Sequence, residues 1–308
     1  MQFLSKSFDP GTDSGLSCIV ATGSRIDQLV TGFRFVEGPV WYSIESTLLF
    51  SDIIGNTMYR WSEPEGLSVF RKPSNMANGN TLDREGRLLS CEHATSRVSR
   101  TDRDGSYEVL VTHFEGRELN SPNDIIVSRN GNIFFTDPAS GRGVPYGVER
   151  KQELDFQGVY KLNPKNRELT LLADDFVLPN GLCFSQDESL LFVNDTRRQH
   201  IRVFDVKADQ TICNGRVWAS TDGDLPGVAD GMKLDSAGNL YSSGSGGIHV
   251  FDQQGTSLGV IRIPEVAANF TWGGEDLRDL LITATSSVYR LRVKIPGYRP
   301  FTPMVSTI

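Results

Sequence analysis

The chain of 308 residues has a formal net charge of −7, with 38% hydrophobic and 22% charged residues. This composition is ordinary for a soluble globular protein, and it argues against nucleic acid as a partner, which needs clustered Lys and Arg. No apolar run approaches the roughly 18 residues that span a bilayer. The polar N-terminus lacks the apolar core of a secretory signal, so we expect neither a membrane partner nor secretion.

In chain order, a strand is predicted at residues 25–30. Six similar units then follow, each with a polar residue, a short strand, an Asp, Asn or Gly turn, and a further strand. The units open at positions 37, 78, 123, 180, 230 and 269, so neighbouring openings are 39 to 57 residues apart. Repeats of about 40–50 residues are typical of four-stranded propeller blades. The longest interval contains residues 139–156, a Gly-, Arg- and Glu-rich insertion that we interpret as a loop.

These repeats predict an all-β protein, a six-bladed β-propeller with four-stranded blades. Closing the ring removes exposed sheet edges, and we expect the N-terminal strand to join the last blade. Amphipathic helices are not evident, which disfavours a Rossmann or TIM-barrel fold. The expected organisation is a leader segment at residues 1–24 and a single propeller domain at residues 25–308.

The first strand of each blade lines the channel of a propeller, so the six opening residues are expected around one mouth. They are Glu37, Asn78, Asn123, Asn180, Asp230 and Asn269. Carboxylate and amide oxygens suit Ca²⁺ or Mg²⁺ better than a thiolate-binding metal. For any single Asn, a local turn role is the simpler interpretation, but the shared repeat position of Glu37, Asn180 and Asp230 favours a metal site.

Other polar residues have less specific interpretations. Asp83, Asp187 and Asp235 recur in the hairpin turns and are assigned a turn role, whereas Asp137 and Asp195 either support the site or cap backbone amides. His93 follows an inner strand and either reaches the site or fills a loop. The sequence has no G-x-S-x-G elbow, so a serine-hydrolase triad lacks its nucleophile motif.

The four cysteines form no C-x-x-C pair, which leaves a zinc knuckle unsupported. They are Cys18, Cys91, Cys183 and Cys213. Cys183 lies in an apolar strand and is interpreted as a small core residue. A reducing cytoplasm fits this pattern best. The sequence leaves the oligomeric state open, with a homodimer among the options.

Six short motifs, in order and in phase, carry a family resemblance. They are Glu37-Gly38-Pro39-Val40-Trp41, Asn78-Gly79-Asn80-Thr81-Leu82-Asp83, Asn120-Ser121-Pro122-Asn123-Asp124, Phe135-Thr136-Asp137-Pro138, Pro179-Asn180-Gly181-Leu182 and Asp230-Gly231. Over roughly residues 25–293 the chain resembles the senescence-marker/regucalcin and gluconolactonase family, in its gluconolactonase-like branch. Three departures from the pattern of the branch occur. Residues 139–144 separate Thr-Asp-Pro from Pro-Tyr-Gly, Ala229 stands where the branch often has Pro, and Phe35 stands where it commonly has Trp.

The resemblance implies a propeller that hydrolyses lactones with a divalent metal. By position, the family's metal ligands fall on Glu37, Asn180 and Asp230, with Asn123 as a fourth ligand or a substrate contact. Calcium is favoured, with magnesium, manganese or zinc as alternatives. Asp230 is then the expected general base, and Asn123 would share the catalytic site.

The expected substrate is an aldonolactone such as gluconolactone, which places the chain in carbohydrate metabolism. The metal would polarise the carbonyl, Asp230 would assist attack by water, and Asn78, Asn123 and His93 would contact the substrate. Two alternatives stay open. One is a calcium-dependent phosphotriesterase or arylesterase on the same scaffold, and the other is a metal-binding propeller without catalysis.

Overall fold

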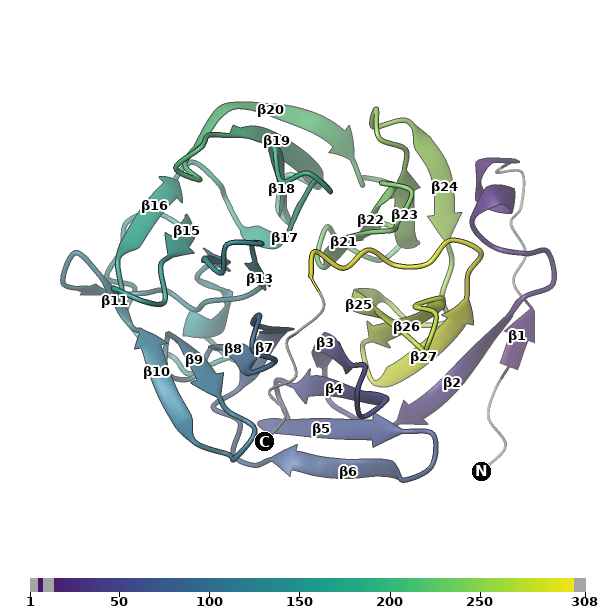
Figure 1. The fold of residues 1–308 in the computed structure, drawn as a ribbon, viewed down its shortest axis with the longest axis horizontal. Helices are drawn as coiled ribbons and strands as arrows, with labels where there is room; N and C mark the ends of the chain where they lie inside the picture. The colour runs from purple at the N-terminus through teal and green to yellow at the C-terminus, as the bar shows by residue number, and fades with distance from the viewer. Residues whose placement is uncertain (1–4, 8–13, 302–308) are drawn as a thin grey trace.

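The computed structural model describes residues 5–7 and 14–301. Its strands form six antiparallel sheets arranged in a ring (Figure 1), which confirms the predicted six-bladed propeller. Blade 1 contains β3 (Val36–Tyr42), β4 (Thr47–Asp52), β5 (Thr57–Ser62) and β6 (Gly66–Arg71), and blade 2 contains β7 (Ala77–Leu82), β8 (Leu88–Glu92), β9 (Arg97–Thr101) and β10 (Tyr107–Val111). Blade 3 contains β13 (Ile125–Val127), β14 (Ile133–Asp137), β15 (Gly158–Leu162) and β16 (Leu169–Ala173). A two-stranded hairpin of β11 (His113–Phe114) and β12 (Arg117–Glu118) lies between blades 2 and 3 in the sequence.

The remaining blades follow the same antiparallel order from the axis outward. Blade 4 contains β17 (Pro179–Phe184), β18 (Leu190–Asp195), β19 (His200–Val206) and β20 (Ile212–Ser220). Blade 5 contains β21 (Met232–Leu234), β22 (Leu240–Gly244), β23 (Gly247–Phe251) and β24 (Ser257–Ile261). Blade 6 contains β25 (Ala267–Gly273), β26 (Asp279–Ala284) and β27 (Ser287–Arg292).

The hydrophobic core lies between neighbouring blades. Phe134 and Val159 of blade 3, for example, pack against Leu182 and Leu191 of blade 4. The second strands β4, β8, β14 and β22 are buried at every residue, whereas the outer strand β6 alternates between half-buried and exposed positions. This gradient follows from the ring, because each inner sheet face is covered by the next blade.

The N-terminal part of the chain closes the ring, as the sequence predicted. Strand β2 (Arg25–Thr31) pairs with β27, and β1 (Ser5–Ser7) pairs with β2, which gives the last blade five strands. The 3-10 helix η1 (Ser14–Cys18) contacts β24, and Ile19 belongs to a core cluster with residues of blades 5 and 6. The boundary between a leader at residues 1–24 and a propeller domain at residues 25–308 stays a prediction.

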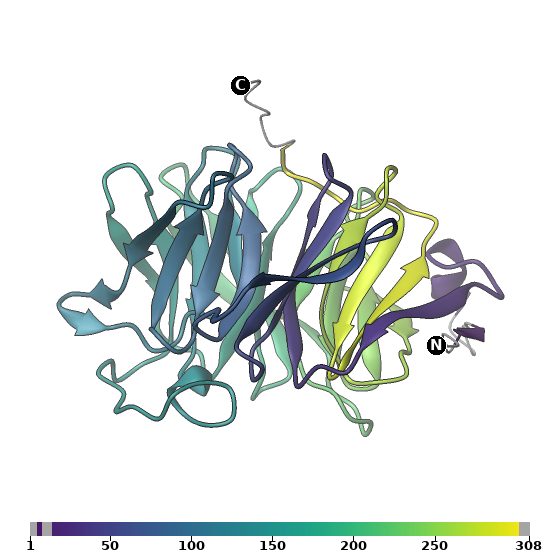
Figure 2. The ribbon, with the colours of Figure 1, turned by 90° about the horizontal axis from the view of Figure 1, so that it is seen from below.

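The two faces of the disc differ (Figure 2). The last described residues cross the face that is toward the viewer in Figure 1, where Tyr298 N–H donates to the carbonyl oxygen of Leu234. The insertion at residues 139–156, with the 3-10 helix η2 (Ser140–Arg142), lies on the opposite face. Its interpretation as a loop is confirmed.

All four cysteines lie within the described ranges and are free thiols. Among the described residues, no helix is long and apolar enough to cross a membrane.

Candidate active site at the axis of the propeller

The inner strands carry the candidate site residues at irregular points of their backbone. The pairing register shifts at Glu37 in β3 and at Asn269 in β25, and a shift in β17 spans Asn180. Such bulges turn a side chain away from the regular pleat. Asn123 and Asp230 instead precede the short strands β13 and β21. All of the opening residues lie at or next to the start of an inner strand, as the sequence predicted.

Glycine follows four of the six opening residues, and it allows the inner strands to approach closely around the axis. A Cβ on Gly79 would overlap the carbonyl oxygen of Asn123, and a Cβ on Gly181 would overlap that of Asp230. The N–H of Gly79 donates to the Asn123 carbonyl at 2.8 Å, and the N–H of Gly181 donates to the Asp230 carbonyl at 3.1 Å. Close contact between strands is therefore the reason for glycine at these two positions.

Side chains from the second strands hold the inner carbonyl groups in place. Thr136 Oγ1 in β14 donates to the Asn180 carbonyl at 2.8 Å, and Asn194 Nδ2 in β18 donates to the Asp230 carbonyl at 2.5 Å. In both cases the donor side chain belongs to the blade that precedes the acceptor's blade in the sequence. Sequence reasoning missed Thr136 and Asn194 in this role. The signal that could have found them is a polar residue inside an otherwise apolar, buried strand.

Glu37 and Asp230 bring two carboxylates to the axis. Glu37 is 3% exposed, and it accepts hydrogen bonds from the Gly38 N–H and from Asn269 Nδ2 at 3.1 Å. Burial and the negative charge of Asp124 raise the pKa of Glu37 to about 7. Asp230 keeps partial access to solvent, yet desolvation and the charges of Glu37 and Asp124 raise its pKa well above the usual range. Like charges this close destabilise the doubly ionised pair unless a cation joins them.

Asp124 adds a third carboxylate that the sequence analysis left unassigned beside Asn123. Its Oδ1 accepts the Ile125 N–H at 2.9 Å, while its Oδ2 is buried without a hydrogen-bond partner. Burial raises the pKa of Asp124, and the positive charge of Lys233 on β21 opposes this rise. Lys233 is therefore close enough for its positive charge to act on the acidic cluster.

A chain of hydrogen bonds fixes the tautomer of His93. Its Nδ1 is 2.8 Å from the Tyr146 carbonyl oxygen, which can only accept, so Nδ1 carries the proton. Its Nε2 then accepts from Asn78 Nδ2 at 3.1 Å. Burial lowers the pKa of His93 to about 4, so the ring is neutral near pH 7. This arrangement leaves Asn78 Oδ1 as a buried acceptor without a partner.

The other two asparagines differ in how they are held. Asn180 Nδ2 donates to Thr196 Oγ1 at 3.2 Å, and a side-chain hydrogen bond from Asn180 lowers the pKa of Asp230. Asn123 is 7% exposed, and within the described residues its side chain forms no hydrogen bond. The amide of Asn123 is therefore free for a ligand.

The axial residues fit a hard cation. Within residues 5–7 and 14–301, no group of three or more His, Cys, Asp or Glu side chains could hold a metal by itself. A cation at the axis therefore needs amide oxygens as well as the carboxylates of Glu37 and Asp230. Asparagine supplies such oxygens, which Ca²⁺ accepts readily. The unpartnered acceptors Asn78 Oδ1 and Asp124 Oδ2 are further evidence that the cluster is incomplete without a ligand.

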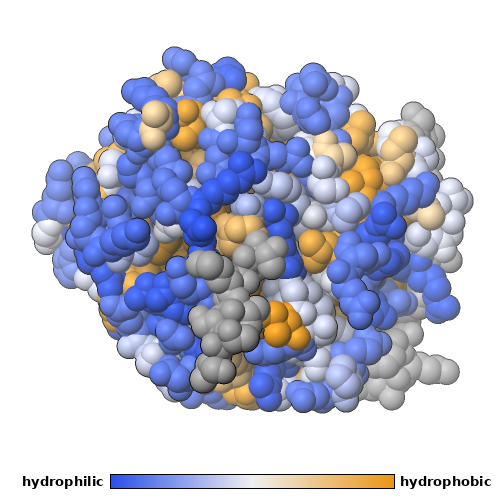
Figure 3. Space-filling view, viewed as in Figure 1, coloured by the Kyte–Doolittle hydropathy of each residue, from blue (hydrophilic) through white to orange (hydrophobic). Residues whose placement is uncertain are grey.

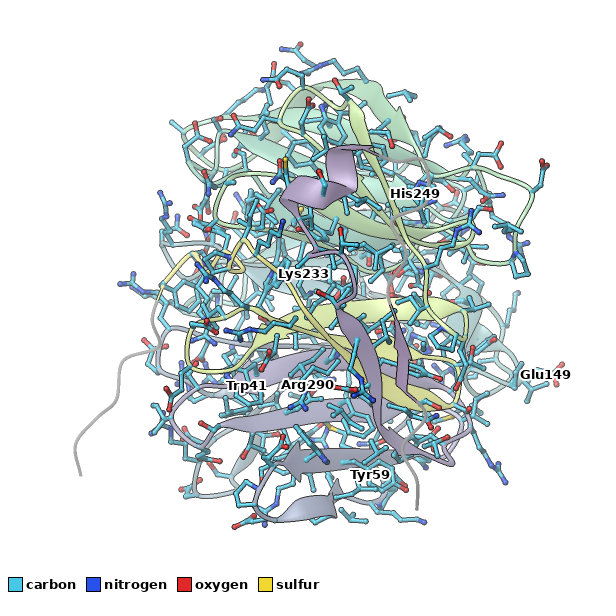
Figure 4. All side chains as sticks on the ribbon, turned by 90° about the vertical axis from the view of Figure 1, so that its right-hand side faces the viewer. Trp41, Tyr59, Glu149, Lys233, His249 and Arg290 are labelled. Atoms are coloured by element: carbon cyan, nitrogen blue, oxygen red, sulfur yellow. The ribbon has the colours of Figure 1, made fainter. Side chains whose placement is uncertain are left out.

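The insertion at residues 139–156 borders this end of the channel. The rings of Tyr146 and Phe35 are 5.1 Å apart, which joins the insertion to blade 1. Arg150 fixes the insertion to blade 2, since its guanidinium donates to the His93 carbonyl at 2.9 Å and to Ser96 Oγ. Figure 4 shows Glu149 of the insertion on the face opposite the C-terminal crossing.

The interpretation of three aspartates as turn residues is confirmed. Asp83 Oδ1 accepts the N–H groups of Glu85 and Arg87, and Asp187 and Asp235 do the same in their own turns. Two further aspartates, Asp137 and Asp195, cap backbone amides, at Asn120 and at residues 177–178 respectively. These five carboxylates build hairpins and loops rather than the axial cluster.

Six four-stranded blades with carboxylates and amide oxygens gathered at the axis define a propeller with an oxygen-rich ligand site. The family described as "SMP-30/Gluconolactonase/LRE-like region" matches residues 35–286, and the chain belongs to this family. The resemblance predicted from the six motifs is thereby confirmed, and so is the expected enzyme class of the family, a lactonase.

Individual relatives agree with this membership. A gluconolactonase of Zymomonas mobilis is 31% identical over 92% of this chain and 85% of its own length. A pentonolactonase of Haloferax volcanii is 28% identical, with 82% of both chains covered. The solved structure of a Xanthomonas campestris gluconolactonase is 33% identical, covers 94% of this chain and 95% of its own, and superposes with a TM-score of 0.86.

Proposed function

We propose that the protein opens the ring of a sugar lactone, most simply an aldonolactone such as gluconolactone. The observation that carries the proposal is the pair of adjoining carboxylates, Glu37 and Asp230, surrounded by asparagine side chains at the axis. The lactonases among the relatives support the reaction class. In this proposal Glu37, Asn180, Asp230 and Asn123 hold one divalent cation, with Ca²⁺ favoured over Mg²⁺, Mn²⁺ or Zn²⁺ by the all-oxygen donor set.

A bound divalent cation supplies electrostatic stabilisation of the negative charge that develops on the lactone carbonyl oxygen. The chain's own residues do the rest. Asp230 takes the proton of the attacking water as general base. Its position suits this role, because it is partly open to solvent while Asn194 and Gly181 fix its backbone carbonyl. With the neighbouring charges of Glu37 and Asp124 offset, Asp230 would be available as a carboxylate.

Asn123 and Asn78 would bind the hydroxyl groups and ring oxygen of the lactone. Asn123 offers a free amide, and Asn78 offers an unpartnered Oδ1. His93 was predicted as a substrate contact; we now place it behind Asn78, since both of its ring nitrogens are engaged. Phe35 and Tyr146 stand at the mouth, where an aromatic pair can pack against the apolar face of a sugar ring.

The test is a panel of lactones with purified protein, with chelator and with each of the four cations. We expect turnover of aldonolactones that disappears with chelator and returns with Ca²⁺. Glu37→Gln should abolish both metal binding and turnover, while Asp187→Asn in an exposed turn should leave both unchanged. Absence of turnover on every lactone with every cation would refute the proposal.

The same panel separates the alternatives. Faster hydrolysis of fluorophosphate or aryl esters than of any lactone would identify a phosphotriesterase or arylesterase. Stoichiometric metal binding without any turnover would identify a binding propeller. A cytoplasmic location and a homodimer stay predictions, to be checked by fractionation and by light scattering.

A further inference from the structure

The end of the channel opposite the insertion holds a cavity with a volume of about 240 Å³. It is lined mainly by apolar and aromatic side chains of the inner strands, among them Trp41, Ile125, Phe184 and Trp272. The crossing segment at residues 298–301 forms part of its wall. Apolar residues are exposed near the centre of this face in Figure 3. The cavity is smaller than most drug-sized ligand pockets, so it suits a small ligand.

Three cations line this cavity: Arg103, which is exposed, Lys233 and Arg299. Within the described ranges, Lys233 on β21 and Arg299 in the crossing segment form no hydrogen bond and no salt bridge, although the charge of Lys233 also acts on Glu37 and Asp124. The Nη2 atom of Arg299 is buried, and burial lowers the pKa of this guanidinium. In Figure 4, Lys233 lies inside the disc, with Trp41 toward the face that the crossing segment covers. Buried donors without acceptors are costly unless a ligand satisfies them.

Trp41 Nε1 is a further buried donor without a partner at this cavity, whereas two neighbouring donors are satisfied. Trp272 Nε1 donates to the Leu234 carbonyl at 2.9 Å, and Tyr298 OH donates to the Gln186 carbonyl at 2.8 Å. The acidic residues at the cavity do not neutralise the pair. Glu45 is exposed, and Glu188 accepts the backbone N–H of Arg129 at 2.7 Å.

We propose that this cavity binds a small apolar carboxylate, at a site distinct from the lactone site. The carboxylate would pair with Arg299 and Lys233, and its aliphatic or aryl body would lie against Trp41 and Trp272. The buried polar atoms there without a partner, Trp41 Nε1 and Arg299 Nη2, are donors, so the ligand must supply acceptors. The apolar walls disfavour a sugar acid, because its hydroxyl groups would lose water without gaining partners.

The experiment titrates the full chain with octanoate and with octanamide, which differ in charge and little in shape. Calorimetry gives the affinity, and tryptophan fluorescence reports occupancy, since two of the four tryptophans line the cavity. We expect saturable 1:1 binding of octanoate, with octanamide at least about tenfold weaker because it offers no charge for Arg299 and Lys233. A lack of saturable octanoate binding, or equal binding of the two probes, would overturn the proposal.

Variants locate the site. Arg299→Met should weaken octanoate binding by about tenfold or more, whereas Arg299→Lys should retain most of it. Arg216→Met removes an exposed cation of the outer strand β20 and is the matched control, with no expected change. Octanoate binding that is unaffected by Arg299→Met, or that is competitive with the lactone, would place the ligand elsewhere and refute the site. Because binding is measured directly, the result does not depend on lactone hydrolysis.

Discussion

The crowding of carboxylates at the axis predicts that one substitution stabilises the metal-free protein while it removes activity. In Asp230→Asn, an uncharged amide replaces a group whose pKa is raised well above its usual range by burial and by the charges of Glu37 and Asp124. Two unit charges about 4 Å apart repel by about 4 kcal/mol at an effective dielectric constant near 20. Proton uptake already relieves part of this repulsion, so we expect a gain of about 1–2 kcal/mol.

For a domain of this size each kcal/mol corresponds to about 2–4 °C. The Tm of Asp230→Asn should therefore exceed that of the parent protein by about 2–6 °C, measured by calorimetry with chelator at pH 8. Loss of the general base should reduce lactone turnover by about 10²–10⁴-fold in the presence of cation. The same substitution should therefore raise the stability of the metal-free protein and lower its activity.

Asp235→Asn is the matched control. Asp235 Oδ2 accepts hydrogen bonds from Asn239 Nδ2 at 2.7 Å and from Tyr241 OH at 3.2 Å. An amide nitrogen in place of this oxygen would oppose those donors and cost about 1–3 kcal/mol. An unchanged or lower Tm for metal-free Asp230→Asn, or full turnover by that variant, would refute the view of the axis as a cluster of mutually repelling carboxylates.

Three further predictions follow from hydrogen bonds and charges at and near the axis. The pKa of Glu37 is raised from its ordinary 4.5 to about 7, so the folded chain binds this proton more tightly than the unfolded chain. The stabilisation that the folded chain gains by binding this proton at Glu37 is complete below about pH 4.5, and it is lost as the pH rises through about 7. The Tm of the metal-free protein should therefore fall between pH 5 and pH 8. Added Ca²⁺ should then raise the Tm more at pH 8 than at pH 5, and equal increments would contradict this assignment. Asn194→Ala removes the donor to the Asp230 carbonyl and should cost about 1–3 kcal/mol by denaturant unfolding, together with a lower kcat; unchanged kinetics would show that the donor does not position Asp230. Tyr160→Phe should be neutral or stabilising by the same measurement, because its buried hydroxyl has no partner, and a loss above about 1 kcal/mol would mean that the hydroxyl is bonded.

Sequence patterns were sufficient to predict the blades because each repeat contains the residues that form its own hairpin turn. Asp83 and Asp235 form the same local turn in different blades, and such contacts are readable within a few residues. The N-terminal closure was also predictable, since a propeller leaves one strand position to fill.

Contacts between blades could not be predicted in the same way. The pairing of Thr136 with the Asn180 carbonyl spans 44 residues and depends on how two sheets pack. Asp124 was overlooked because its neighbour Asn123 has the position expected of a site residue, and only the fold shows that both face the axis. The partnerless Arg299 lies outside the repeats, so no repeat position marks it.

The hydrogen bonds from Thr136 and Asn194 cross from the donor's blade to the following blade. They therefore determine where the chain can be joined to that of a relative without breaking the site. The structural repeat is the sheet, but the unit that builds the site is the second strand of one blade with the inner strand of the next. A blade exchanged with a relative at the sheet boundary would separate Asn194 from the carbonyl it supports. A chimera whose junctions lie between the inner strand and the second strand of a blade would take each donor and the carbonyl group that it supports from the same parent. Recombination between lactonases of this family should therefore preserve activity at the second kind of junction more often than at the first.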